Sequence, residues 1–461
     1  MALKKKVFSE KKFKTFPIYL ILLIIISLYV GYIFVFHKPD IKFDSTKTVS
    51  LSGIQTRVLP KDSQIKDIEL KFISENNTEF LLDNKEINLD DGIIDINYSF
   101  LNNEKITKFF KKNNDKNIYL NFKISYENIF FNRILEKKIK LLVDVLPPKI
   151  FDVTTDGYVY LGGIGYVKYK TSNDASKTYI DNGNGNIFYP ISSVKDNFTE
   201  HLVFFSCSNK PCKNQKIEII AEDLSLNKSK VSKKIKTIKN KRWKEINILL
   251  SRDMMHDKYE EIFNEDIEIF SKENFIKLNK DERLRNETYI NSITSKITNK
   301  RLFDGKFHQL KNSKVSSEFS ELRTYLFNDD AENIVDKQYH WGIDLSSLKN
   351  AKVYAANKGT VVLVEESLGI YGGVVIIDHG LGFYSLYSHL ENIQVKISQS
   401  VTLSTIVGNT GTTGFAFGDH LHFGIFLQGV AVDPVEFLDE NYLNIKIYNP
   451  HDEFINLGQK N

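Results

Sequence analysis

Apolar and polar residues alternate along much of the first half of this 461-residue chain, and the pattern predicts short strands. Between residues 37 and 146, the stretches DIELKFIS, IIDINYSF, NIYLNFKISY and KIKLLVDV repeat with a period of two. Asn, Asp and Lys residues separate them. Strands at this spacing are typical of a β-sandwich. Pro147 and Pro148 then interrupt the pattern and indicate a module boundary.

A second β-rich module is expected over residues 147–240. GYVYLGGIGYVKYKT alternates around a Gly-Gly bend, and QKIEIIAEDLSLNKSKVSKKIKTIK follows as a hairpin. The turn of this hairpin, with Ala221, Asp223 and Asn227, resembles the last hairpin of bacterial immunoglobulin-like modules. The resemblance covers this hairpin alone, and it implies an immunoglobulin-like β-sandwich.

The pattern changes at residues 241–302, where apolar residues recur near helical spacing among many charges. We expect a helical linker that packs against the following domain or covers its groove. Over residues 303–448, short β runs such as GGVVIIDHG and FYSLYSHL return between Gly-rich turns. These runs predict a compact all-β domain, and residues 449–461 are left as a C-terminal tail. The fold class is therefore mainly β, with a single N-terminal helix.

The N-terminus predicts a membrane anchor. Residues 1–15 are rich in lysine, and residues 16–36, FPIYLILLIIISLYVGYIFVF, carry no charge. A helix of this length spans roughly 30 Å, the thickness of a bilayer core. The positive-inside rule places the basic tail in the cytoplasm and the bulk of the chain outside the cytoplasmic membrane, in the periplasm of a Gram-negative cell. A cleaved signal peptide is the alternative, but VGYIFVFHKPD offers no small-x-small cleavage site.

Charge and cysteine content narrow the classes of partner. The formal net charge is only +4, and no basic stripe with interleaved aromatic residues is present, which argues against nucleic-acid binding. Cys207 and Cys212 lie in SCSNKPCKN. An exported chain meets an oxidising compartment, so we expect a local disulfide, with two free thiols as the alternative. A zinc site would need more ligands than this pair.

Histidines are concentrated in the C-terminal β domain, together with one aspartate. The spacings are H-x-x-x-D for His340 and Asp344, and H-x-H for His420 and His422. Both offsets are even, so each pair would share one face of a strand. Two imidazoles and one carboxylate suit a catalytic zinc site with water in the fourth position. A single histidine on an apolar face is usually a core residue, but these spacings occur together with His389.

Three stretches carry a clear resemblance: HWGIDLSS, ANKGTVVLVEESLGIYGGVVIIDHGLGFYSLYSHL and GNTGTTGFAFGDHLHFGIFLQGVAVDP. They resemble the lysostaphin/LytM-type (duplicated hybrid motif) zinc metallopeptidases that cut peptidoglycan cross-links, over roughly residues 303–440. The resemblance implies one zinc ion bound by His340, Asp344 and His422. It also implies catalytic roles for His389 and His420. His420 would act as general base, and His389 would donate to the oxyanion or help to transfer the proton.

Three further residues accompany these motifs. His379 in IDHG matches a turn of the family, and we assign it none. Asp419 either orients a catalytic imidazole or belongs to the rim of the site. Arg323 resembles an arginine found upstream of the first zinc histidine, but its spacing from Phe319 is one residue longer than usual. We therefore leave Arg323 out of the predicted site.

The sequence thus predicts a membrane-anchored zinc metalloendopeptidase that hydrolyses peptide cross-links or stem peptides of peptidoglycan. The alternative is a non-catalytic LytM-like scaffold or activator of cell-wall amidases, and protein regulators could bind through the β modules at residues 37–240. Family members without catalysis typically lack zinc ligands. All five matching positions are filled here, which favours the enzyme.

Overall fold

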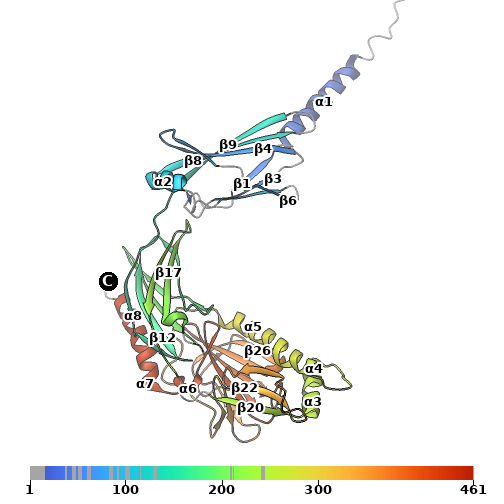
Figure 1. Ribbon diagram of the computed structural model, residues 1–461, viewed down its shortest axis with the longest axis vertical. Coiled ribbons are helices and arrows are strands. Elements are labelled where there is room, and N and C mark those ends of the chain that lie inside the picture. Colours follow the sequence, from blue (N-terminus) through green and yellow to red (C-terminus); the bar gives the residue numbers. More distant parts are fainter. Residues whose placement is uncertain are drawn as a thin grey trace, which may run out of the picture. The chain divides into compact units, whose positions relative to one another are not determined.

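A computed structural model describes residues 16–459 with short gaps (Figure 1). The gaps are residues 37–38, 44–47, 50–53, 60–63, 83–86, 91–92, 99–103, 115, 128–131, 208–209, 211 and 240–243. The expected basic tail, residues 1–15, lies outside the described residues. The chain divides into two compact units. The first contains Met1–Pro147 and Glu222–Lys228, and the second contains Pro148–Ala221 and Ser229–Asn461.

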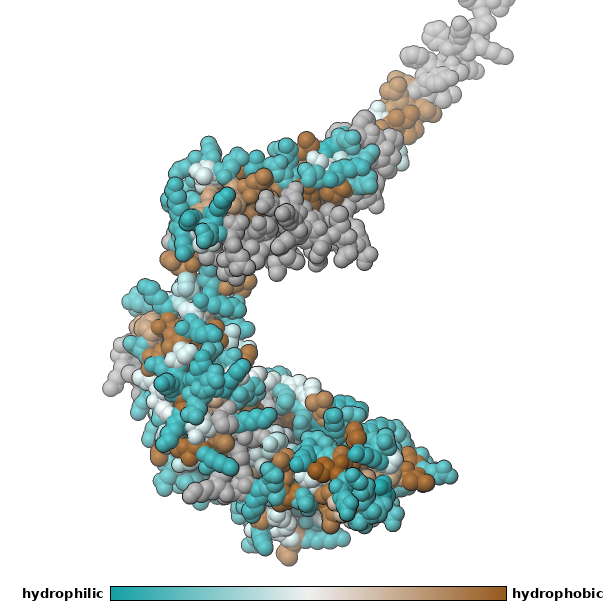
Figure 2. All heavy atoms as spheres, viewed as in Figure 1, coloured by the Kyte–Doolittle hydropathy of each residue, from teal (hydrophilic) through white to brown (hydrophobic). Residues whose placement is uncertain are grey.

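Helix α1 comprises Phe16–Phe36, the stretch expected to cross a membrane. Its described side chains are mostly apolar and exposed, and Figure 2 shows them as a brown segment. Within the part of the chain that the structure describes, no helix combines the length and apolarity needed to cross a membrane. The anchor therefore stays a prediction.

The remainder of the first unit consists of two sheets. One sheet has the order β1-β3-β7-β6, and the other has the order β2-β9-β8-β4-β5. The strands and the one helix are β1 Asp40–Phe43, β2 Thr48–Val49, β3 Ile54–Leu59, β4 Gln64–Ser74, β5 Glu79–Leu82, β6 Ile87–Asp90, β7 Ile93–Tyr98, α2 Glu104–Lys112, β8 Asn117–Glu127 and β9 Asn132–Val143. Burial alternates along β8, as the sequence pattern requires. Phe72 of β4, Phe110 of α2 and Phe122 of β8 are fully buried in one core.

The second unit begins with another pair of antiparallel sheets, ordered β10-β12-β16-β15 and β14-β13-β17-β18. The elements are β10 Ile150–Thr155, β11 Tyr158–Tyr160, β12 Ile164–Thr171, β13 Ala175–Asp181, β14 Ile187–Phe188, β15 Ile191–Val194, β16 Thr199–Ser206, η3 Lys213–Gln215, β17 Lys216–Asp223, β18 Lys228–Lys234 and β19 Lys236–Ile238. The Asp223 carboxylate accepts a hydrogen bond from the Asn227 backbone N–H at 2.9 Å, so these two residues form the expected turn. A Cys207–Cys212 disulfide confirms the predicted pairing.

The stretch expected as a helical linker starts with a strand. β20 (Glu245–Leu250) pairs in parallel with β22, and α3 (Arg252–Phe263), α4 (Lys272–Ile276), the π-helical η4 (Lys277–Glu282) and α5 (Arg283–Thr294) follow. The helices do not stand apart from the next domain. Met255, Tyr259, Phe275 and Ile290 are buried in one core with residues of that domain. The helical periodicity correctly predicted the helices. It did not predict β20, which forms because it pairs with the edge strand β22 (Leu322–Phe327).

The C-terminal domain is a mainly antiparallel β structure. Its large sheet follows the order β21-β24-β31-β28-β27-β26-β29, and β20-β22-β23 form a smaller sheet. The strands and the short helix η5 are β21 Lys314–Ser317, β22 Leu322–Phe327, β23 Asp336–Tyr339, β24 Ile343–Ser346, β25 Lys352–Tyr354, β26 Gly359–Leu368, η5 Gly369–Tyr371, β27 Gly372–Gly380, β28 Phe383–Glu391, β29 Ser400–Val401, β30 Ile406–Thr410, β31 Leu421–Leu427 and β32 Val430–Val432. The mainly β class is confirmed. The prediction that residues 303–448 are all β is wrong, because residues 434–448 form short helices.

Helices take the place of the expected C-terminal tail. α6 (Pro434–Phe437), α7 (Glu440–Leu443) and η6 (Asn444–Tyr448) lead into α8 (Asn449–Gln459). Phe454 of α8 is buried in the core that the C-terminal domain shares with the β module of residues 150–238. Lys446 is also buried, and its ammonium donates to the Asp156 carboxylate at 2.5 Å. These contacts hold the C-terminal helices against the β strands of residues 150–238 and against the C-terminal domain.

Candidate metal centre and active site

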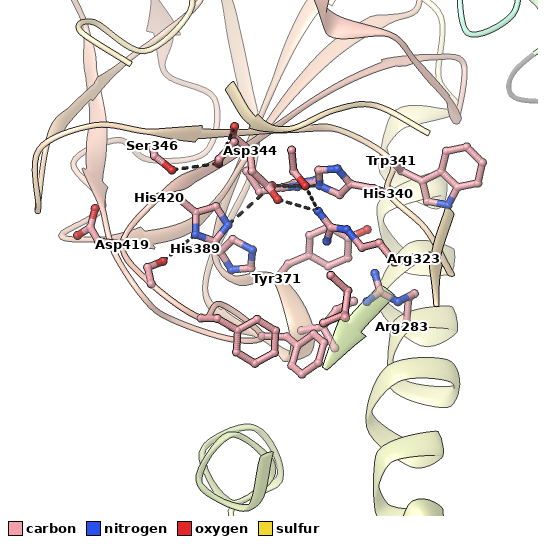
Figure 3. A pocket seen from close by; sticks show the side chains of 18 of the residues that line it. Arg283, Arg323, His340, Trp341, Asp344, Ser346, Tyr371, His389, Asp419 and His420 are labelled. Carbon is pink, nitrogen blue, oxygen red and sulfur yellow. Dashed lines mark hydrogen bonds and ion pairs between the residues drawn. The ribbon is translucent and has the colours of Figure 1, made fainter. Parts of the chain in front are cut away.

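Three side chains from different parts of the β domain meet in a cleft (Figure 3). Asp344 on β24 lies directly opposite His422 on β31 in their antiparallel register, and His340 follows the last residue of β23. The Nε2 atom of His340, the Oδ1 atom of Asp344 and the Nδ1 atom of His422 lie 2.9 to 3.0 Å from one another. The structure therefore brings together all three residues predicted to bind the metal.

The prediction that His340 and Asp344 share one face of a single strand is wrong. β23 ends at Tyr339 and β24 begins at Ile343, so the H-x-x-x-D motif crosses a break between two strands. Gly342 lies in this break, and a Cβ atom there would be 2.6 Å from Cε1 of His422. Because Gly342 has no side chain, the His422 ring has room at this position. A larger residue here would clash with that ring.

The three converging atoms fit a metal ion. His340 Nδ1 lies 2.9 Å from the Glu318 carbonyl, so its N–H donates there and Nε2 presents a lone pair. Asp344 Oδ1 is also an acceptor. A single proton on His422 cannot satisfy three mutual contacts, whereas a central cation can. With bonds of 2.0 to 2.1 Å, tetrahedral zinc places its ligand atoms about 3.3 Å apart, close to the observed spacing. Within the described residues, this is the group identified as able to hold a metal.

The charge states in the structure suit such a site. Burial would raise the pKa of Asp344, but His340, His422 and Arg323 outweigh it and hold that pKa well below its ordinary value. Burial lowers the pKa of His422 to about 4, so its imidazole is neutral near pH 7. An ionised carboxylate and a neutral imidazole are the forms that bind zinc.

Arg323 belongs to the site although it was left out of the prediction. It lies on β22, and its Nη2 group donates to Asp344 Oδ2 at 2.9 Å and to Ser317 Oγ at 2.8 Å. The Ser317 hydroxyl in turn donates to Glu321 at 2.6 Å. This network fixes the carboxylate of Asp344 so that Oδ1 faces the two imidazoles. The family resemblance pointed to Arg323, and only the spacing from Phe319 argued against it.

His389 and His420 form the second half of the site. Their ring centroids lie 4.8 Å apart, and His420 Nε2 is 3.7 Å from Asp344 Oδ1. His420 Nδ1 donates to the Gly418 carbonyl at 2.7 Å, and His389 Nδ1 donates to the Thr413 carbonyl at 2.8 Å. Each imidazole thus keeps Nε2 as a proton acceptor. Burial and the neighbouring histidines hold the pKa of His389 well below its ordinary value.

The backbone at His389 is strained, since its φ is +59° at the end of β28. A left-handed conformation costs a residue other than glycine on the order of 1 kcal/mol. The neighbouring strand β31 pairs with β28 without a register shift. His420 lies just before it, His422 faces the cleft, and the intervening and following Leu421 and Phe423 are buried in the core, as the alternation predicts.

Asp419 and His379 have structural rather than catalytic surroundings. Asp419 accepts hydrogen bonds from Thr410 Oγ1 at 2.6 Å and from the Asn350 N–H at 2.9 Å, so it belongs to the rim. His379 is fully buried, with its ring nitrogens 2.7 Å from the Lys358 carbonyl and 2.7 Å from Ser385 Oγ. Its position in the core agrees with the absence of an assigned role.

Burial lowers the pKa of His379 to about 4, which leads to a prediction about stability. The unfolded chain binds a proton on this residue below about pH 6.5, but the folded chain does not. Unfolding is therefore favoured as pH falls from 6.5 toward 4, by on the order of 3 kcal/mol in total. Denaturant titrations of His379→Asn between pH 7.5 and 5 should show lower stability at pH 7.5 and a flatter decline. An unchanged slope, equal to that of the exposed-site control His308→Asn, would contradict the assignment.

The cleft has a volume of about 350 Å³, and the helical segment forms part of its wall. Figure 3 shows Arg283 of α5 on the side opposite His420, with Tyr371 between them. The ring centroid of Tyr371 lies 6.0 Å from that of His422. Neither residue was identified from the sequence. The Gly-rich GIYGG stretch could have indicated a close approach at Tyr371, but no local pattern indicates Arg283.

Helix α3 holds the loop that orients His389. Lys258 Nζ donates to the Thr412 carbonyl at 2.7 Å, and Glu261 Oε1 accepts from the Gly414 N–H at 3.1 Å. Lys258 and Glu261 also pair with each other at 2.7 Å. Thr412 and Gly414 flank Thr413, whose carbonyl accepts the hydrogen bond from His389 Nδ1. The segment before the β domain therefore contributes to the geometry of the site.

For the metal-dependent catalysis that the sequence predicts, removing the Glu261 contact should slow turnover without removing the metal. We expect Glu261→Ala to lower kcat roughly three- to tenfold, because the loop loses one hydrogen bond and the ordering of Lys258. Zinc content and KM should stay near the wild-type values. Steady-state kinetics with metal analysis on the same samples gives the answer, and Asp257→Asn, at an exposed position of α3, is the control. Loss of zinc in Glu261→Ala would show a general structural role instead.

An antiparallel β domain here brings two histidines and one aspartate together, with two further histidines in the same cleft, and this set of residues is typical of metal-dependent hydrolytic sites. Residues 338–434 match the model of peptidase family M23, and this part of the chain is a domain of that family. The matched range contains His340, Asp344, His389, His420 and His422. The resemblance inferred from the sequence is confirmed.

Curated relatives match over part of their length. The chain is 28% identical over 152 residues to an "Uncharacterized metalloprotease" of Buchnera aphidicola, covering 33% of this chain and 39% of the relative. It is 37% identical over 97 residues to a "Lipoprotein NlpD/LppB homolog" of Pseudomonas aeruginosa, covering 21% and 32%. It is 31% identical over 99 residues to the "Murein hydrolase activator NlpD" of Salmonella dublin, covering 22% and 26%. The chain thus spans less than two fifths of each of these relatives.

Two solved structures also align with part of the chain. A putative peptidase M23 from Pseudomonas aeruginosa aligns with 60% of this chain and 94% of its own, at 17% identity and a TM-score of 0.35. The catalytic domain of lysostaphin from Staphylococcus simulans aligns with 29% of this chain and 98% of its own, at 25% identity and a TM-score of 0.24.

Proposed function

We propose that this protein is a zinc metalloendopeptidase that hydrolyses peptide cross-links or stem peptides of peptidoglycan. The observation that carries the proposal is the convergence of His340 Nε2, Asp344 Oδ1 and His422 Nδ1 within 3.0 Å, beside two histidines with free acceptor nitrogens. His340, Asp344 and His422 would hold the metal. Bound zinc would act as a Lewis acid that polarises the peptide carbonyl and lowers the pKa of water.

The chain's own groups divide the remaining work. His420 is placed to accept a proton from the attacking water, because its Nε2 carries a lone pair and points toward the metal ligands. His389, whose ring lies beside that of His420, is placed to accept and return a proton, and the Thr413 carbonyl fixes its ring. In its protonated form His389 would be a strong donor to the developing oxyanion, since its low pKa favours release of the proton. Arg323 keeps Asp344 ionised and oriented.

A non-catalytic role as an activator of cell-wall hydrolases is the second candidate. Relatives that bear the name of murein hydrolase activator support it. The filled metal-ligand set and the two aligned histidines favour the enzyme, because an activator that acts by binding alone needs none of these groups. The β modules before residue 240 offer surfaces for regulators under either function.

The purified chain tests the two candidates directly. We expect about one zinc ion per chain, release of soluble muropeptides from isolated sacculi, and loss of that release with a chelator and recovery with zinc. Mass analysis of the products identifies the bond that is cut. A metal-free chain that releases no product, but stimulates an added amidase, would instead support the activator.

We also propose that the N-terminal part anchors the chain in the cytoplasmic membrane, with the bulk on the outer side. The uncharged sequence of residues 16–36, which follows the lysine-rich residues 1–15, supports an anchor. The Cys207–Cys212 disulfide suits an oxidising compartment. Cell fractionation followed by alkaline extraction distinguishes an integral protein from a released one. Protease accessibility in spheroplasts then reports the side on which the β modules lie.

A further inference from the structure

Helix α5 carries two oppositely charged residues, Arg283 and Glu287, one helical turn apart. Each lines a cavity that Tyr371 also borders. Arg283 lines the main cleft, and Glu287 lines a smaller neighbouring cavity of about 140 Å³. Residues four apart lie on the same face of a helix. Tyr371 and Trp341 border both cavities, so the two spaces adjoin at these rings. The helix lies outside the range that matches the peptidase family.

Arg283 is held ready for a ligand. Its Nε group donates to the Asn279 carbonyl at 3.0 Å, and Nη2 donates to Asn279 Oδ1 at 2.7 Å. Asn279 is itself buried and donates to Asp336 at 2.8 Å, so the guanidinium has a fixed support. Among the described residues, its Nη1 group has no hydrogen-bond partner. An oriented guanidinium with a free edge is suited to a carboxylate.

Glu287, in contrast, is a negatively charged group that lacks a hydrogen-bond donor. Its Oε1 atom is buried and has no hydrogen-bond partner within the described residues. Burial raises the pKa of this carboxyl, and the charge of Arg283 opposes that shift only in part. The two side chains form no ion pair, because Arg283 is bonded to Asn279. A buried carboxylate oxygen without a donor is costly, and an ammonium group that enters the cavity would relieve this cost.

The position of the pair places it beside the reaction centre. The charges of both Glu287 and Arg283 act on the Tyr371 phenol, whose pKa is raised chiefly by burial. The same ring lies 6.0 Å from that of His422. A substrate residue next to the bond at the metal would therefore reach both charges. A cavity of about 140 Å³ accommodates a short aminoalkyl group, and a glycine or alanine residue would leave it empty.

We propose that Arg283, Glu287 and Tyr371 form a substrate subsite for a peptide residue that carries both a free ammonium and a carboxylate group, as the end of a diamino acid does. Glu287 binds the ammonium group and Arg283 binds the carboxylate. This subsite rests on the proposed peptidase function, and it names the residue that the enzyme selects. The preceding helical segment thereby sets specificity for a centre that the β domain supplies.

Four synthetic peptides test the subsite on the full chain. They share one cleavable sequence and differ in whether the amine of the diamino residue is free or acetylated, and whether its carboxylate is free or amidated. For the fully charged peptide, we expect Glu287→Gln and Arg283→Gln each to lower kcat/KM roughly tenfold or more. Glu287→Gln should have little effect on the acetylated peptide, and Arg283→Gln little effect on the amidated one. Arg285→Gln, at a position 70% exposed on the same helix, is the control.

Two measurements distinguish failure of the subsite proposal from failure of the proposed peptidase function. Zinc content should equal that of the wild type in all three variants, because none of them contacts the metal ligands. Calorimetric binding of the four peptides to the chelator-treated wild-type chain does not depend on cleavage. Equal affinity for charged and blocked peptides would overturn the subsite even if no peptide is cut. Equal losses on all four peptides would likewise reduce Arg283 and Glu287 to supports of the fold.

Discussion

Replacing His422 by alanine is expected to abolish zinc binding and, with it, all measurable hydrolysis. Nδ1 of His422 is one of three atoms that converge within 3.0 Å, and two ligands do not hold zinc tightly in competition with water. The loss of a ring next to Asp344 also leaves that buried carboxylate with one partner fewer. Metal content by mass spectrometry and release of muropeptides from sacculi measure the two effects on one sample.

A matched control keeps this result specific. His308 is exposed and distant in sequence from the motif, and His308→Ala should keep one zinc and full activity. Circular dichroism of both variants would show that the β fold persists, since β31 retains its buried Leu421 and Phe423. Retention of about one zinc per chain in His422→Ala would contradict the assignment of the metal centre.

Replacing His389 by asparagine is expected to slow turnover about a hundred- to a thousandfold while the zinc content stays unchanged. Asparagine tolerates the left-handed backbone found at this position, so the change removes the imidazole with little added strain. The ring centroid of His389 lies 6.0 Å from that of His422, and its hydrogen-bond partner is the Thr413 carbonyl rather than a ligand atom. Steady-state kinetics should place the loss in kcat rather than in KM.

The pH profile separates a proton-transfer role from a structural one. If His389 transfers a proton, the remaining activity of His389→Asn should lose one of the ionisations that shape the wild-type profile. His389→Ala, which strains the same backbone without an amide side chain, should be less stable and similarly slow. Loss of metal in His389→Asn to the extent seen in His422→Ala would refute the division between ligands and proton carriers.

The sequence predicted the parts of this protein whose signals are local. Alternation with a period of two located the β modules, and burial along β8 follows it residue by residue. The H-x-H motif placed His420 and His422 toward the cleft, with Leu421 and Phe423 in the core. These predictions succeed because the two faces of a strand are set by backbone geometry, and the sequence needs only to match that period.

Other features depended on contacts between residues far apart in the chain. The stretch 241–302 looked helical throughout, yet β20 became a strand because the edge of β22 was available to pair with it. The expected C-terminal tail forms helix α8, because Phe454 packs into the core of the second unit. Local preferences of this size are readily overridden by tertiary contacts.

The site itself shows the same division. The sequence alone pointed to the five residues to which we assign the chemistry, from the spacing of histidines and an aspartate and from the resemblance that those motifs carry. Only the tertiary structure decided that a break at Gly342 turns His340 toward Asp344, that Arg323 fixes that carboxylate, and that α3 and α5 border the cleft. The physical reason is that residue type and spacing record which groups are present. The distances between groups on separate elements are set by packing, which no short stretch of sequence contains.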